Sequence, residues 1–157
     1  MKVLVTGAAG LIGHEIISQL LAHGHEVTGL FRSLDCQDRQ KGIEAIAVDL
    51  ADEGASDYFE QNHFDVVVHC AAAVPSFTDE NEQERVATIN RKIDDNIFSL
   101  CQKDKRRLIY LSGTSVYGGG GDTLINESAS TGPIGSYVKE KLWAETKIKN
   151  LSIPSVI

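Results

Sequence analysis

The chain opens on Lys2-Val3-Leu4-Val5-Thr6-Gly7-Ala8-Ala9-Gly10-Leu11-Ile12-Gly13, an apolar run that passes into three evenly spaced glycines. Residues 2–6 predict a buried strand, because β-branched and large apolar side chains follow one another until a glycine ends the run. Residues 11–23 carry apolar side chains at helical spacing and are followed by Gly24, which predicts a helix. The chain therefore begins with a strand, a glycine-rich turn and a helix.

Each of the three glycines has its own physical role in such a turn. Gly7 lets the chain leave the strand tightly. Gly10 has no Cβ, so the backbone can approach a phosphate, and Gly13 lets the helix pack closely on the strand. The N–H groups at the helix start and the positive end of the helix dipole attract an anion. We therefore expect a site for the pyrophosphate of a dinucleotide, built from Gly7, Ala9, Gly10, Leu11, Ile12 and Gly13.

Strand patterns alternate with helix patterns along the rest of the chain. Further strands are predicted over residues 25–31, 43–48, 64–70, 107–112 and 153–157, and further helices over residues 53–60, 80–102 and 136–150. The Gly-, Ser- and Thr-rich residues 118–135 predict a loop. This alternation predicts an α/β fold of the Rossmann type, a doubly wound parallel sheet in three α/β/α layers. We expect residues 1–157 to form one dinucleotide-binding domain.

The composition argues against several classes of protein. A net charge of −7 disfavours a general nucleic-acid binder or a membrane-surface binder. The sequence shows no secretory leader and no apolar run long enough to span a bilayer. Cys36, Cys70 and Cys101 are far apart and lack the spacing of metal ligands, so we expect free thiols, no metal site and a cytoplasmic location.

The end of the second strand indicates which dinucleotide is bound. NAD sites place an acidic residue there to hold the ribose 2′-hydroxyl, whereas this chain has Arg32 followed by Ser33. A carboxylate would repel a 2′-phosphate, and an arginine would pair with it bidentately. We therefore expect NADP(H), with NAD(H) as the alternative. Asp49, after the third strand, could accept a hydrogen bond from the adenine amino group, or it could cap a helix.

Tyr137 and Lys141 are candidates for acid–base chemistry. They are four residues apart in a predicted helix, so they share one face. A neighbouring ammonium and a cationic nicotinamide favour the phenolate, which predicts that the pKa of Tyr137 falls toward neutral pH. Such a pair is more often an ordinary surface pair, but here it follows a fifth strand and a loop downstream of a phosphate-binding turn. We expect Lys141 also to reach the nicotinamide ribose.

With these motifs in place, the chain resembles the extended short-chain dehydrogenase/reductases of the NAD-dependent epimerase/dehydratase family. The resemblance covers essentially the whole chain. The matching segments are Thr6–Gly13, Asp49-Leu50, Asp65-Val66-Val67-Val68-His69-Cys70-Ala71-Ala72, Asn90, Ser112-Gly113-Thr114-Ser115-Val116-Tyr117-Gly118 and Tyr137-Val138-Lys139-Glu140-Lys141.

The resemblance implies roles for individual residues. Ala71 and Ala72 would line the cofactor near its ribose, and Leu50 and Ala73 would join this cofactor-binding set. Asn90 would have a structural role in the long helix. Tyr137 would be the catalytic acid/base and Lys141 its partner, and both would also contact the cofactor.

Two departures from the family pattern stand out. The family usually has a Ser or Thr three residues before the valine of Val116-Tyr117-Gly118, and this chain has Gly113. Ser112 or Thr114 could supply the missing hydroxyl, with equal weight. Family members also run to about twice this length, so we expect a chain that lacks the C-terminal substrate region and corresponds to the N-terminal part of a longer enzyme.

These features together predict an NADP(H)-dependent oxidoreductase or epimerase/dehydratase acting on a sugar-like or carbonyl/alcohol substrate, such as a nucleotide sugar. The alternative is a non-catalytic NAD(P)-binding module or cofactor sensor, which Gly113 and the short chain would favour. A homodimer is a candidate assembly, because a sheet that stops at its sixth strand leaves an edge for another chain.

Overall fold

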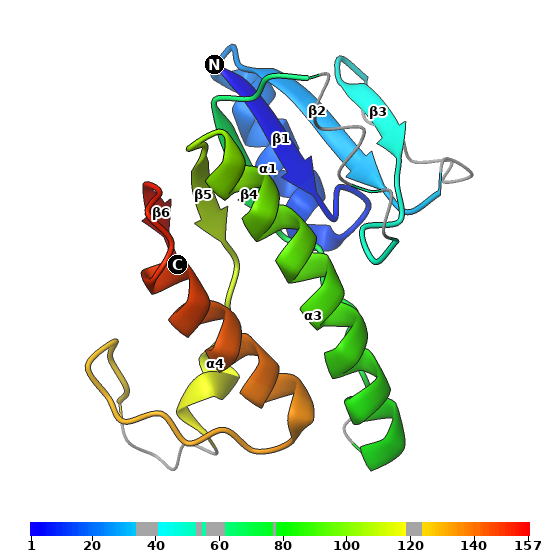
Figure 1. Cartoon of the computed structure of the whole chain (residues 1–157). Helices are drawn as coiled ribbons and strands as arrows, with labels where there is room; N and C mark the ends of the chain where they lie inside the picture. The colour runs from blue at the N-terminus through cyan, green and yellow to red at the C-terminus, as the bar shows by residue number, and fades with distance from the viewer. Residues whose placement is uncertain (34–40, 53–54, 56–61, 77, 119–123) are drawn as a thin grey trace.

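The computed structural model describes residues 1–33, 41–52, 55, 62–76, 78–118 and 124–157. Within them, six parallel strands form one sheet in the order β3-β2-β1-β4-β5-β6. The strands are β1 (Lys2–Thr6), β2 (Glu26–Phe31), β3 (Glu44–Ala47), β4 (Val66–His69), β5 (Arg107–Tyr110) and β6 (Ser155–Val156). The helices are α1 (Leu11–Ala22), α3 (Glu80–Lys103), the short 3₁₀ helix η1 (Thr114–Tyr117) and α4 (Ser136–Lys149) (Figure 1).

Strand β1 lies at the centre of the sheet, between β2 and β4. Val3 pairs with Val27 of β2 on one edge and with Val66 of β4 on the other. The chain builds outward from β1 to β3 and then returns to place β4 on the opposite side. The strand order therefore reverses between β1 and β4, and the chain continues from these two strands to helices on opposite faces of the sheet. In doubly wound sheets this is the point at which ligands bind.

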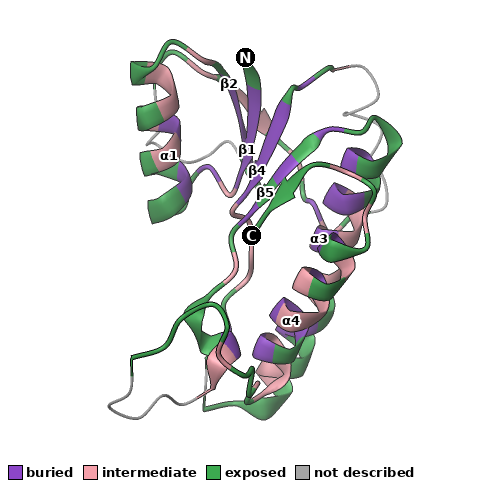
Figure 2. Ribbon diagram, turned by 90° about the vertical axis from the view of Figure 1, so that its left-hand side faces the viewer, coloured by how far each residue is buried: buried purple, intermediate pink, exposed green. Residues whose placement is uncertain are grey.

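The helices cover both faces of the sheet. Figure 2 shows α1 on one side of the strands and α3 with α4 on the other, which gives the three predicted layers. Successive side chains of a strand point to opposite faces, so Val3 and Val5 pack with Ile17 of α1 in one core cluster. Leu4 packs with Ile97 of α3 in the other cluster.

The long helix α3 has the end signals that its sequence predicts. Asp79 is the N-cap, and its side chain accepts a hydrogen bond from the backbone N–H of Glu82. Glu80 and Glu82 lie in the first turn and Lys103 in the last, which suits the helix dipole. The helix also buries two polar residues, Asn90 and Asp94, on the side that faces the sheet.

Most elements lie within one or two residues of their predicted bounds. The last strand is shorter than expected, since residues 153–157 contribute only Ser155–Val156. Helix η1 was not predicted, because four residues carry too little periodicity to identify a helix. The helix expected over residues 53–60 lies almost wholly outside the described residues. No helix in the described part of the chain is long and apolar enough to cross a membrane.

We predict that Leu108 makes a large contribution to the stability of the sheet. Its side chain is fully buried in β5 against α3 and α4, so Leu108→Ala should lower the free energy of unfolding in urea by about 3 kcal/mol. The matched control is Leu124→Ala, because Leu124 is fully exposed and its truncation should change stability by less than about 0.5 kcal/mol. Equal effects of the two substitutions would contradict the assignment of Leu108 to the core.

Candidate functional site

The glycine-rich turn after β1 has the geometry of a phosphate cradle. Gly7 has a φ of +67°, and a Cβ there would lie 2.8 Å from the backbone nitrogen of Ala71. The Gly10 N–H donates to the Gly7 carbonyl oxygen at 2.9 Å, which closes the turn. A Cβ on Gly13 would collide with that same carbonyl. A side chain at Gly7 or Gly13 would therefore push α1 away from the ends of β1 and β4.

The N-terminus of α1 can receive an anion. Gly10 is the N-cap and provides no side-chain cap, and the first turn carries no acidic residue. The first N–H groups of the helix, on Leu11, Ile12 and Gly13, lack carbonyl partners within the helix. Leu11 is 90% exposed and Ile12 49% exposed. This arrangement fits a pyrophosphate at the backbone, as in other dinucleotide-binding turns.

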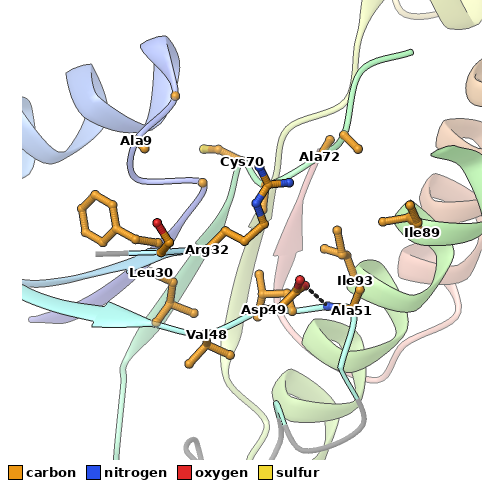
Figure 3. Close-up of a pocket in the computed structure, with 17 residues that line it drawn as sticks. Ala9, Leu30, Arg32, Val48, Asp49, Ala51, Cys70, Ala72, Ile89 and Ile93 are labelled. Atoms are coloured by element: carbon orange, nitrogen blue, oxygen red, sulfur yellow. Dashed lines mark hydrogen bonds between the residues drawn. The ribbon is translucent and has the colours of Figure 1, made fainter. Parts of the chain in front are cut away.

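A pocket of about 520 Å³ lies over the carboxyl ends of the strands, beside this turn (Figure 3). A volume of this size is typical of a small-molecule or cofactor site. Its lining combines nine residues predicted for cofactor binding: Gly7, Ala9, Gly10, Arg32, Asp49, Leu50, Ala71, Ala72 and Ala73. The other five residues predicted for cofactor binding are not part of its lining: Leu11, Ile12 and Gly13 lie next to it in α1, and Tyr137 and Lys141 belong to α4.

The far end of the pocket is formed where β2 and β3 end. Arg32 and Ser33 follow β2, and Arg32 extends into the pocket as an exposed side chain (Figure 3). Asp49 follows β3, and its Oδ1 accepts a hydrogen bond from the Ala51 N–H at 2.9 Å. Asp49 thus lines the pocket and also accepts a backbone hydrogen bond within the turn that follows β3.

The segment after β4 forms the wall between the two ends of the pocket. The Ala71 N–H donates to Thr6 Oγ1 at 3.1 Å, which ties this wall to the end of β1. Asn90 on α3 holds the next turn by a pair of hydrogen bonds: its Oδ1 accepts from the Ala73 N–H at 2.8 Å, and its Nδ2 donates to the Ala73 carbonyl at 2.9 Å. The structural role expected for Asn90 is confirmed.

The pocket also contains residues that the sequence pattern does not single out as site residues. On α3, Ile89, Ile93, Ile97 and Leu100 recur every three or four residues as an apolar stripe, and Ile89 and Ile93 line the pocket. The stripe of α3 thus serves the core along one part of the helix and the pocket along another. The remaining additions, which follow directly from strand ends, are Leu30, Phe31, Ser33, Val48, Ala51 and Cys70. Strand ends in a parallel sheet are the signal that could have identified them.

Lys141 is buried on α4 and is held by two hydrogen bonds. Its Nζ donates to the Tyr110 hydroxyl at 3.0 Å and to the Leu111 carbonyl at 3.3 Å. Burial lowers the pKa of Lys141, and nearby Asp94 and Cys70 act in the opposite direction.

Tyr137 differs from expectation in its titration. We expected its pKa to fall, but burial and then the Asp94 carboxylate raise the pKa of Tyr137 above its ordinary value. The physical reason is that a half-buried phenolate loses hydration and lies near the Asp94 carboxylate. The Lys141 ammonium, for its part, donates to the Tyr110 hydroxyl and to the Leu111 carbonyl. In the chain alone, Tyr137 is therefore a protonated phenol at neutral pH.

The two candidates for the missing hydroxyl at Gly113 are placed differently. Ser112 Oγ donates a hydrogen bond to Glu145 Oε1 on α4 at 2.5 Å, so its proton is already directed at a carboxylate. Thr114 is exposed at the first position of η1, which packs on α4. Gly113 itself is extended, and the nearest neighbour of a Cβ built there would be Ser115 Oγ at 3.6 Å.

Comparison with known proteins identifies relatives of this arrangement. A dTDP-4-dehydrorhamnose reductase of Mycolicibacterium smegmatis is 31% identical over 148 residues, which cover 94% of this chain and 41% of the reductase. A probable low-salt glycan biosynthesis reductase of Haloferax volcanii is 26% identical over 162 residues, which cover 100% of this chain and 52% of that reductase. The chain thus spans about half the length of these curated relatives or less.

Solved structures share the fold. The UDP-glucose 4-epimerase of Thermus thermophilus, in complex with NAD, superposes with a TM-score of 0.87 at 26% identity, over 99% of this chain and 53% of the epimerase. The UDP-Glc/GlcNAc 4-epimerase of Campylobacter jejuni gives a TM-score of 0.86 at 25% identity, over 96% of this chain and 49% of that one. The sequence model of the NAD dependent epimerase/dehydratase family matches residues 3–152 of this chain. With its nucleotide-binding turn and pocket inside that range, the chain belongs to the NAD dependent epimerase/dehydratase family.

Proposed function

We propose that this chain is the cofactor-binding part of an NADP(H)-dependent oxidoreductase or epimerase/dehydratase that acts on a sugar-like carbonyl or alcohol. The observation that carries the proposal is the pocket over the strand ends, which joins the phosphate-binding turn, Arg32 and Asp49 in one cavity. Lys141 lies buried on α4 and donates to the Tyr110 hydroxyl and the Leu111 carbonyl at the end of β5. Family membership supports a nicotinamide dinucleotide as the cofactor.

The preference for NADP(H) rests on the end of β2. Arg32 is the first residue after the strand, and its side chain reaches into the pocket. A guanidinium can hold a 2′-phosphate by two parallel hydrogen bonds, and Ser33 beside it can add a third. The Thermus epimerase is described in complex with NAD, so a preference for NADP(H) would distinguish this chain from that structure.

Tyr137, supported by Lys141, would transfer a proton to or from the reacting oxygen of the substrate. A bound nicotinamide supplies the donor or acceptor of a hydride. The raised pKa of Tyr137 keeps its hydroxyl protonated at neutral pH, which suits donation of that proton to a carbonyl oxygen as it becomes an alcohol. Lys141, one turn further along α4, would stabilise the phenolate that remains.

The proposed substrate class is a nucleotide sugar. The names of the relatives above refer to dTDP- and UDP-linked sugars. Their reactions concern a hydroxyl or carbonyl on the sugar ring, which fits a tyrosine that exchanges one proton. Thr114 is our choice for the hydroxyl that would bind the reacting oxygen, since it is exposed at the start of η1 and the Ser112 proton is directed to Glu145.

A second candidate function is a non-catalytic NAD(P)-binding module. Gly113 favours it, because no side-chain hydroxyl occupies the position where the family usually carries Ser or Thr. In that case the pocket would bind a dinucleotide, and Tyr137 would have no reacting oxygen held in front of it. The two functions share cofactor binding and differ in turnover.

Arg32 is expected to determine cofactor choice. The chain should bind NADPH about tenfold more tightly than NADH, and Arg32→Ala should remove this difference by weakening NADPH alone, because charge-assisted hydrogen bonds are lost. Titration followed by nicotinamide fluorescence measures both affinities. Arg107→Ala is the matched control, since Arg107 is exposed at the start of β5, at the opposite end of the strands. Equal affinities in the unsubstituted chain would overturn the NADP preference, and binding of neither would overturn the proposed function.

Tyr137→Phe should abolish turnover and leave cofactor binding intact. Loss of the phenolic proton removes general acid–base catalysis, so the rate should fall by about 10²-fold or more. The assay follows NADPH oxidation with dTDP-4-dehydrorhamnose and, separately, interconversion of UDP-glucose. NADPH affinity is the internal control. Because this chain is proposed to be one part of an enzyme, the assay uses the full-length protein. Retained turnover in its Tyr137→Phe variant would refute the role of Tyr137. Absent turnover in the unsubstituted full-length protein, with normal NADPH binding, would favour the non-catalytic module.

Gly113→Ser should increase turnover. The backbone of Gly113 is extended, with φ −159° and ψ 150°, and a Cβ there meets nothing closer than 3.6 Å, so serine fits without strain. A restored hydrogen bond to the reacting oxygen is worth up to about 10²-fold in rate. If Thr114 already provides that bond, Thr114→Val should slow the unsubstituted chain but have little effect in the Gly113→Ser background. A Thr114→Val variant of full activity would exclude Thr114.

A further inference from the structure

A buried carboxylate lies beneath the proposed catalytic site without belonging to it. Asp94 is only 2% exposed, in the middle of α3, and it faces the sheet. A buried charge is costly unless it is hydrogen-bonded and paired. Its neighbour Asp95 lies toward the surface and forms an ion pair with Lys147 of α4. Two adjacent aspartates therefore have different surroundings, and those of Asp94 require an explanation.

Both oxygens of Asp94 accept hydrogen bonds from buried side chains. Oδ1 accepts from His69 Nε2 at 2.9 Å, and Oδ2 accepts from the Tyr110 hydroxyl at 3.1 Å. The other side of the His69 ring meets Thr6, with 2.6 Å between Nδ1 and Oγ1. Thr6 Oγ1 in turn accepts the Ala71 N–H. Asp94 is therefore the centre of a hydrogen-bond network. One branch of it runs through His69 to Thr6, the residue before Gly7, and to Ala71 in the pocket wall.

The other branch ends at Lys141. The Tyr110 hydroxyl accepts from Lys141 Nζ at 3.0 Å while it donates to Asp94. Burial, followed by the nearby Asp94 charge, raises the pKa of Tyr110 far above its ordinary value, so the hydroxyl stays neutral and keeps the proton that it donates. The Lys141 ammonium, the neutral Tyr110 hydroxyl and the Asp94 carboxylate are therefore joined by hydrogen bonds in a row. They form an ion pair that the hydroxyl bridges.

The other charged and titratable groups around Lys141 are differently engaged. On α4, Glu140 is bound by Arg91 and Glu145 accepts the Ser112 hydroxyl. After β4, Cys70 has a pKa raised by burial, so it is a neutral thiol at neutral pH. Asp94, on α3, is thus the carboxylate that a chain of hydrogen bonds connects to the Lys141 ammonium.

We propose that Asp94 is the counter-ion of Lys141, acting through the Tyr110 hydroxyl as a positioning residue that keeps the lysine charged and fixed in place. This inference rests on the proposed function in one respect only, that Lys141 takes part in acid–base chemistry. Burial alone would favour the neutral amine, and a neutral Lys141 could not stabilise a phenolate on Tyr137. The same network links the charge on Lys141 to the segment that precedes the phosphate-binding turn.

A purely structural role for Asp94 makes a different prediction. In that case the carboxylate would only satisfy His69 and Tyr110, and its removal would lower stability without changing the titration of Lys141. If Asp94 is the counter-ion, its neutralisation must lower the pKa of Lys141, because the charged amine loses its compensating anion in a buried site. The pKa of Lys141 therefore distinguishes the two roles.

The test is an NMR titration of the lysine Nζ signals in the ¹⁵N-lysine-labelled chain, with the Lys141 signal assigned by its loss in Lys141→Arg. In Asp94→Asn the pKa of Lys141 should fall by about 1 pH unit, the lower end of the range for a close opposite charge. Tyr110→Phe should also lower it, since the bridge and the hydrogen-bond acceptor are removed. Asp95→Asn is the matched control and should leave the Lys141 titration unchanged.

Circular dichroism first establishes which variants are folded. If Asp94→Asn does not fold, the pKa of Lys141 in Tyr110→Phe is the deciding measurement. An unchanged Lys141 pKa in the folded variants would overturn the inference. An equal fall in Asp95→Asn would also overturn it, because the effect would then be general electrostatics. The proposed function fails on a different result: if Tyr137→Phe and Lys141→Met retain turnover, Lys141 is not catalytic, whatever its titration shows.

Discussion

The close contact between Gly7 and the end of β4 is the constraint on which the rest of this structure depends. The position of a Gly7 Cβ lies within 3 Å of the Ala71 backbone, so no side chain can separate the first turn from the fourth strand. Gly13 packs α1 onto the Gly7 carbonyl in the same way. These contacts bring the start of α1, the end of β1 and the segment after β4 to one point. The pocket exists because three backbone segments converge there with little side-chain bulk between them.

A polar layer supports this convergence from below. Thr6, just before Gly7, holds both the Ala71 N–H and the His69 ring, while Asn90 holds Ala73 by two hydrogen bonds. The wall of the pocket is thus fixed from the strand side and from α3 at once. A site whose supports are rigid loses less entropy when a flexible dinucleotide binds. These hydrogen bonds distinguish the β1–β4 end of the pocket from its outer end, where Arg32 is an exposed side chain.

Local features of the sequence allowed much of the fold and the pocket to be predicted. The strand β1, the glycines and Arg32 lie within the first 32 residues, and neighbouring residues determine their geometry. The interactions of Lys141 could not be predicted in this way, because Tyr110 is 31 residues distant and meets it only when β5 and α4 pack together. Asp94 and Asp95 are chemically identical neighbours, and only the packing of α3 shows which is buried. The error over the pKa of Tyr137 has the same origin, since burial and Asp94 determine its direction.

The central place of β1 in the sheet also has a consequence for synthesis on the ribosome. Strand β1 emerges before both of its pairing partners, residues 26–30 on one edge and residues 66–69 on the other. The nascent chain can form β1, α1 and β2 early, but β1 keeps one unpaired edge until β4 has left the exit tunnel. During that interval Val3, Val5 and their neighbours present an apolar strand edge, which is the kind of surface that chaperones recognise and that drives misassembly. The element that organises the finished sheet is thus the one that waits longest for its second partner.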